Sequence, residues 1–176
     1  TGWLNTTTCR ESPARRPPFW SVTSLPGRKI LDLGTLKSTD GFRIIGPSTG
    51  SQFGRVVSAV GDVNNDGFAD LGIGTAAQSA YVVFGFGTTN PQGTVTSGMR
   101  TLDATALTAA QGFRLDGTGG NFGANIGSAG DVNRDGVADI MIGANLAAPL
   151  GRSSAGEVYI VYGKAAGTGP FGQLVG

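Results

Sequence analysis

Residues 53–75 read FGRVVSAVGDVNNDGFADLGIGT, and residues 122–144 read FGANIGSAGDVNRDGVADIMIGA. Aligned without gaps, the two stretches are identical at 12 of 23 positions and lie 69 residues apart. The match continues outward, because GFRI at 41–44 returns as GFRL at 112–115, and YVVFG at 81–85 returns as YIVYG at 159–163. The chain therefore contains an internal repeat of about 70 residues. The spacing between the copies grows at 147–157, where we expect a surface loop.

Glycine is the most unusual feature of the composition. It makes up 31 of 176 residues, whereas its typical share is roughly 7%, and each glycine inside a helix costs about 1 kcal/mol. Short runs rich in β-forming residues and bounded by Gly, Pro, Asp or Asn predict strands at 30–36, 42–46, 54–60, 70–74 and 80–84. The sequence thus predicts an all-β protein in which each repeat forms one antiparallel blade of a β-propeller.

The repeats suggest a simple division of the chain. We expect a flexible, basic and proline-rich tail at 1–28, a first blade at 29–99 and a second blade at 100–176. Two blades do not close a ring, so the expected fold is an incomplete propeller. Cys9 is the sole cysteine of the sequence, so neither an internal disulfide nor a cysteine-based zinc site is expected.

Both repeats carry the same nine-residue loop, D-x-N-x-D-G-x-x-D, at 62–70 and 131–139. Oxygen-bearing side chains at positions one, three, five and nine converge when the loop wraps around one point, and a backbone carbonyl at position seven would add another oxygen. Oxygen donors without nitrogen or sulfur favour Ca²⁺, and we expect about two ions, one per repeat. The predicted ligands are Asp62, Asn64, Asp66, Phe68 and Asp70 in the first loop, and Asp131, Asn133, Asp135, Val137 and Asp139 in the second.

Two other structures could give a loop of this composition. An EF-hand needs an acidic ligand at position twelve, but Ile73 and Ile142 stand there. The flanking runs have β-like spacing, so each loop is expected to join two strands of one hairpin. A tight turn made by Asn and Asp geometry alone is the other alternative, and the second matching copy favours the metal site over it. In the FG pairs, Phe53 and Phe122 are expected as core anchors, and the following glycines as close-packing positions.

Charge and residue content argue against several classes of function. The 13 basic and 12 acidic side chains give a net charge of +1, so no global field steers the chain toward nucleic acid. The sequence contains no run of about 18 apolar residues, so membrane insertion is not expected. The sequence has no histidine, nucleophile elbow or phosphate-cradling loop. We do not expect an enzyme, because the acidic residues outside the loops lack paired spacing; they are Glu11, Asp32, Asp40, Asp103, Asp116 and Glu157.

The FG dipeptides at 53 and 122, the two aspartate loops and the LGIG and IMIG segments that follow them resemble FG-GAP repeats. These repeats are the blades of integrin α-subunit propellers and of many bacterial surface proteins. The resemblance covers about residues 30–165. The Gly-Ala-Pro that usually closes the motif is replaced by GTA at 74–76 and GAN at 143–145, which affects a turn rather than the metal loop.

This resemblance implies a seven-bladed propeller in the complete protein, with calcium bound in loops on one face. It also implies a role in cell adhesion or in binding a protein or glycan ligand. Further blades would come from a longer chain or from self-association. An extracellular or cell-surface location is expected, because millimolar calcium suits extracellular modules. A non-catalytic accessory domain of a secreted hydrolase is the alternative.

Overall fold

A computed structural model describes residues 31–165 of the 176-residue chain. The chain divides after residue 34 into two units, and the described residues 35–165 lie in the second unit, which is compact. The tail predicted at 1–28, with Cys9, lies outside the described residues. All strands of the described region belong to the second unit.

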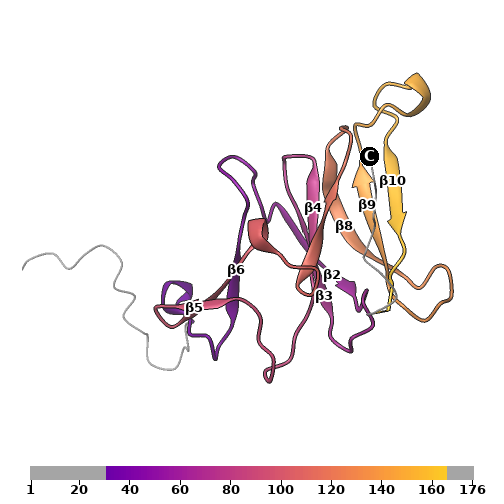
Figure 1. Cartoon of the computed structure of the whole chain (residues 1–176). Coiled ribbons are helices and arrows are strands. Elements are labelled where there is room, and N and C mark those ends of the chain that lie inside the picture. Colours follow the sequence, from indigo (N-terminus) through magenta and orange to yellow (C-terminus); the bar gives the residue numbers. More distant parts are fainter. Residues whose placement is uncertain (1–30, 166–176) are drawn as a thin grey trace, which may run out of the picture. The chain divides into compact units, whose positions relative to one another are not determined.

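Ten short strands form three sheets in the described part of the chain (Figure 1). Sheet A has the order β1 (Phe42–Ile45), β6 (Met99–Asp103), β5 (Thr94–Thr96). Sheet B has the order β2 (Val56–Gly61), β3 (Asp70–Gly74), β4 (Ser79–Val83), β7 (Gly112–Asp116). Sheet C has the order β8 (Phe122–Gly130), β9 (Asp139–Ala144), β10 (Glu157–Val161). The helical elements among these residues are three 3-10 turns, η1 (Leu33–Thr35), η2 (Ala104–Ala106) and η3 (Pro149–Gly151).

The predicted all-β class is confirmed, and the three sheets do not close into a ring. Sheets B and C are antiparallel throughout, as expected of propeller blades. Sheet A differs, because β1 pairs with β6 in parallel, with Ile44 opposite Leu102. The four strands of sheet B also do not come from one stretch of 29–99, because β7 supplies its last strand and pairs Arg114 with Tyr81.

Sheet B is the central layer, and its two faces pack against different neighbours. Val82 on β4 belongs to a buried cluster that includes Ile126 and Ile142 of sheet C. Tyr81 and Val83 point to the opposite face and join a second cluster with sheet A, which includes Leu102. Complete burial of an aliphatic side chain contributes about 1.5–3 kcal/mol. Because both faces are covered, every residue of β4 is buried.

The predicted strands agree with the structure at 42–46, 70–74 and 80–84 to within one residue. The strand predicted at 54–60 begins only at Val56, because Gly54 has a φ of +84°. The prediction for 30–36 is wrong over its described part, where η1 forms instead of a strand. The Oδ1 atom of Asp32 accepts a hydrogen bond from Gly34 N at 2.9 Å, which favours a turn.

The Phe-Gly pairs anchor the two repeats as predicted, with one difference. Phe122 is buried in the cluster between sheets B and C, and Phe53 packs edge-on against Tyr81 with ring centroids 5.4 Å apart. A Cβ at Gly123 would approach the Ser79 carbonyl oxygen to 2.7 Å, so close packing is confirmed there. It is wrong for Gly54, where a Cβ would meet nothing within 4 Å.

Candidate metal loops

Each aspartate-rich loop joins two neighbouring antiparallel strands, as the sequence predicted. The first connects β2 to β3, and the second connects β8 to β9. The glycines at position six, Gly67 and Gly136, have φ values of +89° and +86°. A side chain there would be strained, so the turn requires glycine. Asn65 and Arg134 at position four also have positive φ values, which gives both loops the same backbone path.

Hydrogen bonds from the backbone arrange the side chains of the first loop. Asp62 accepts from Asp66 N at 3.0 Å and from Gly67 N at 2.8 Å. The amide of Asn64 donates to Asp66 Oδ2 at 2.8 Å, and Asn64 Oδ1 accepts from Asp66 N at 3.1 Å. Asp66 Oδ1 in turn accepts from Phe68 N at 2.9 Å. The side chains at positions one, three and five are therefore gathered on one turn.

The second loop repeats this arrangement bond for bond. Asp131 accepts from Asp135 N at 3.0 Å and from Gly136 N at 2.9 Å. Asn133 donates to Asp135 Oδ2 at 2.8 Å and accepts from Asp135 N at 3.0 Å. Asp135 Oδ1 accepts from Val137 N at 2.9 Å. Two loops that differ at positions four and seven thus adopt one hydrogen-bonded geometry.

The carboxylates at position nine, Asp70 and Asp139, are both fully buried. Asp70 accepts from Val63 N and from Gly85 N, each at 2.8 Å. Asp139 accepts from Val132 N at 2.7 Å and from Gly163 N at 2.9 Å. Burial raises the pKa of Asp70 from 3.8 to about 6, although the two backbone donors act in the opposite direction.

Gly85 and Gly163 are site residues that the sequence reasoning missed. Their N–H groups hold the position-nine carboxylates from the far end of the following strand. A Cβ at Gly85 would collide with the Ala69 carbonyl oxygen, and one at Gly163 with that of Ala138. The signal was present in the sequence, because both glycines end the repeated segments YVVFG and YIVYG.

The two loops touch each other where sheets B and C meet. Asp62 O accepts a hydrogen bond from Ala138 N at 3.3 Å, and Val63 O accepts one from Lys164 N at 2.9 Å. The first loop is therefore partly covered by the second repeat. Asn64 is only 7% exposed, whereas its counterpart Asn133 lies on the exposed surface.

The donor set suits a hard cation, since every side chain of the predicted site offers oxygen. Each carboxylate oxygen that accepts one backbone N–H retains a second lone pair. Within residues 31–165, however, no three Asp, Glu, His or Cys side chains are grouped closely enough to hold a metal ion. The structure brings positions one, three and five together and directs position nine into the protein interior, so calcium binding stays a prediction.

Residues 122–161 match the family model of the FG-GAP repeat. The matched segment contains sheet C and the complete second loop. No curated protein matches the chain. Among the described residues, no helix has the length and apolar character needed to cross a membrane. The chain therefore carries an FG-GAP repeat, which in this protein is built from β8, β9 and β10.

Proposed function

We propose that this chain is a calcium-binding β-propeller module that has no catalytic role. The observation that carries the proposal is the duplicated loop. Asp62, Asn64 and Asp66 share one hydrogen-bond pattern with their counterparts in the second loop. A turn that served only to reverse the chain would need neither four oxygen-bearing positions nor a buried carboxylate at position nine.

In this proposal each loop holds one calcium ion through its oxygen-bearing residues. Asp62, Asn64, Asp66 and Asp70 would hold the first ion, and Asp131, Asn133, Asp135 and Asp139 the second, with the carbonyl oxygens of Phe68 and Val137 as further donors. The ion would neutralise carboxylates that otherwise repel one another and would make the folded hairpins more stable.

The acidic residues outside the loops support a non-catalytic role. Asp103 accepts hydrogen bonds from Thr105, and Asp116 pairs with Arg114 at 2.6 Å. Glu157 accepts a hydrogen bond from the hydroxyl of Tyr159. These three carboxylates therefore each have a local structural partner.

A binding role outside the cell follows from the calcium proposal. Loops of this kind in extracellular modules bind calcium at millimolar concentrations. We therefore infer an extracellular or cell-surface location and a role in adhesion through a protein or glycan ligand.

The proposal is tested by titrating calcium into chelator-treated protein by calorimetry while following thermal unfolding. We expect about two bound ions and a melting temperature that rises with calcium. Asp66→Ala and Asp135→Ala should each remove one site. Arg134→Ala is the control, because it changes an exposed loop side chain that has no oxygen to offer. If the melting temperature is the same with and without calcium, the loops only reverse the chain and the calcium proposal is wrong.

A further inference from the structure

Strand β10 is the counterpart of β4, yet it lacks the neighbour that β4 has. β4 pairs with β3 on one side and with β7 on the other. β10 pairs with β9, and no other strand of the described region borders it. The registers establish the equivalence, since Tyr81 lies opposite Ile73 and Tyr159 lies opposite Ile142. Among residues 31–165, sheet C thus corresponds to sheet B without a fourth strand.

The face of β10 that corresponds to the sheet C side of β4 is also uncovered among the described residues, so apolar side chains are exposed there. Val82 is 0% exposed in sheet B, but its counterpart Ile160 is 45% exposed. Ala80 is 0% exposed, but Val158 in the same position is 70% exposed. The residue after the strand differs in the same way, because Phe84 is 5% exposed and its counterpart Tyr162 is 54% exposed. An exposed edge strand with apolar side chains is a template for pairing with another chain.

At the other end of the sheet stack, β1 is similar in sequence to β7, the strand that pairs with β4 in sheet B. GFRI at 41–44 matches GFRL at 112–115, where β7 completes sheet B. Ile44 of β1 packs toward sheet B, just as Leu115 of β7 packs toward sheet C. β1 lies at the edge of sheet A, with β6 on one side.

We propose that β1 of a second copy of this chain pairs with β10 and completes sheet C. The β4–β7 pair gives the register, which places Arg43 opposite Tyr159 and Phe42 opposite Ile160 in an antiparallel ladder. The two strands do not meet within one copy. The core clusters place sheets A and C on opposite faces of sheet B.

Charge complementarity supports this pairing. In sheet B, the Arg114 guanidinium lies 5.9 Å from the centre of the Tyr81 ring and pairs with Asp116 on its own strand. β1 has Ile45 where β7 has Asp116, while β10 has Glu157 where β4 has Ser79. The acidic partner of the arginine is therefore on the fourth strand in sheet B, where Asp116 lies on β7. In the completed sheet C it would be on the third strand, where Glu157 lies on β10. In the assembly, Arg43 would lie over Tyr159 and beside Glu157.

The faces that would meet are also complementary in size. In the internal interface, Ile126 of sheet C lies over Gly72 of sheet B, where a Cβ would come within 3.0 Å of it. The counterparts at the proposed interface are Val57, which is 59% exposed on β2, and Met141, which is 43% exposed on β9. Met141 is larger than its counterpart Gly72, and Val57 is smaller than its counterpart Ile126, so the two changes in size offset each other.

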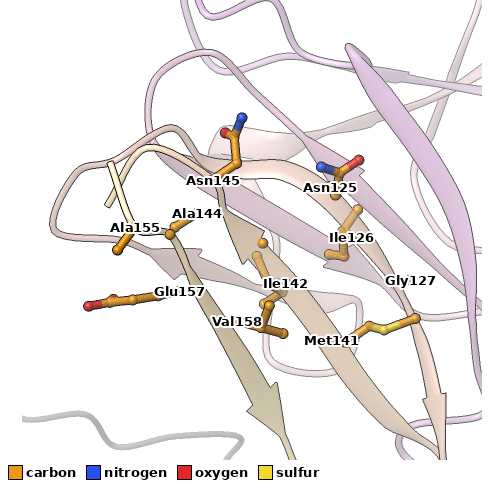
Figure 2. Close-up of a pocket in the computed structure, with 12 residues that line it drawn as sticks. Asn125, Ile126, Gly127, Met141, Ile142, Ala144, Asn145, Ala155, Glu157 and Val158 are labelled. Carbon is orange, nitrogen blue, oxygen red and sulfur yellow. The ribbon is translucent and has the colours of Figure 1, made fainter. Parts of the chain in front are cut away.

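A pocket of about 540 Å³ lies on sheet C at the proposed interface. Figure 2 shows Met141 and Val158 among the residues that line it. Gly127 and Gly143 line the pocket and have no side chains to fill it. We infer that Val57 of the second copy fills part of this hollow. Because the surfaces at the two ends differ, the contact is head-to-tail and leads to a ring or to a growing chain of copies.

The experiment is sedimentation velocity on the whole chain up to about 100 µM, where an interface with a dissociation constant near 10 µM is mostly assembled. Ile160→Lys should weaken assembly at least tenfold, because it places an unpaired charge in the interface. Val95→Lys is the matched control, since Val95 is a strand residue with 47% exposure that lies outside the contact. Thermal unfolding of each variant checks that the monomer is folded. A wild-type chain that stays monomeric overturns the proposal.

A charge exchange tests the register. Arg43→Glu and Glu157→Arg should each weaken assembly several-fold, and the double variant should recover most of the loss. Each experiment is repeated with calcium and with chelator, because none of the interface residues lies in the aspartate loops. If the two single effects simply add in the double variant, the two residues do not meet and the proposed register is wrong.

Discussion

The backbone N–H of Lys164 donates a hydrogen bond to the carbonyl oxygen of Val63 at 2.9 Å, which links the end of the second repeat to the first loop. The preceding residue, Gly163, donates to Asp139, and Val63 itself donates to Asp70. The buried carboxylates of the two loops are therefore connected through the backbone of three residues, Val63, Lys164 and Gly163. This connection makes the loops one structural unit rather than two independent turns.

Gly61 tests the contact between the loops. Gly61 and its counterpart Gly130 both have positive φ values, so alanine at either position should cost about 1–2 kcal/mol in strain. A Cβ at Gly61 would also come within 2.5 Å of the Ala138 Cβ, whereas one at Gly130 would meet nothing within 4 Å. We expect Gly61→Ala to lower the free energy of unfolding more than Gly130→Ala, by about 1–3 kcal/mol. If denaturant titrations show equal losses of unfolding free energy for the two variants, Gly61 and Ala138 are not in close contact.

Asp139 tests the structural role of the buried carboxylate without any metal. In the presence of chelator, Asp139→Ala leaves the N–H groups of Val132 and Gly163 without their acceptor. Each unsatisfied group costs about 1–3 kcal/mol, so the free energy of unfolding should fall by roughly 2–4 kcal/mol. Asp135→Ala is the control, because the bonds it removes are exposed or only partly buried, and its loss should be below about 1 kcal/mol. Similar melting temperatures for the two variants would contradict this account.

The sequence was sufficient to predict the parts of the fold that local signals determine. The two DxNxDG loops predicted hairpins, because glycine at position six and the flanking β-forming runs both favour a reversal of the chain. The structure has antiparallel strands on both sides of each loop. The predicted surface loop at 147–157 likewise contains η3 and the 90% exposed Leu150.

Long-range features were beyond the sequence patterns. The YVVFG segments predicted strands, but periodicity does not state which neighbour a strand takes, so the pairing of β4 with β7 was not foreseen. The parallel pair of β1 and β6 was missed for the same reason. Gly85 was overlooked because it lies 15 residues from Asp70, and only the folded chain brings its N–H to that carboxylate.

Asp103 provides a prediction of pH dependence. Its carboxylate accepts hydrogen bonds from the hydroxyl of Thr105 at 2.7 Å and from Thr105 N at 2.8 Å, which hold its pKa below the ordinary value of 3.8. Because the folded-state pKa is depressed, the stabilisation is present above about 3.8 and is lost as the pH falls through the folded-state value. Thr105→Val removes the hydroxyl and should raise the pKa of Asp103 toward 3.8. Carboxyl NMR titration measures this, and an unchanged midpoint would contradict it.

The link between Lys164 and Val63 predicts that calcium binding in one loop is felt in the other repeat. If an ion orders the first loop, the Val63 carbonyl becomes a better fixed acceptor, and the Lys164 amide should exchange more slowly with deuterium. Asp66→Ala should abolish this slowing at Lys164 while leaving the calcium-dependent protection of the Val137 amide, whose acceptor Asp135 belongs to the second loop. Asp135→Ala should reduce protection at Val137, and it serves as the reciprocal control. If Asp66→Ala leaves the calcium-dependent slowing at Lys164 intact, the ion acts through the second loop alone, and the hydrogen bond between the repeats does not transmit the effect of calcium.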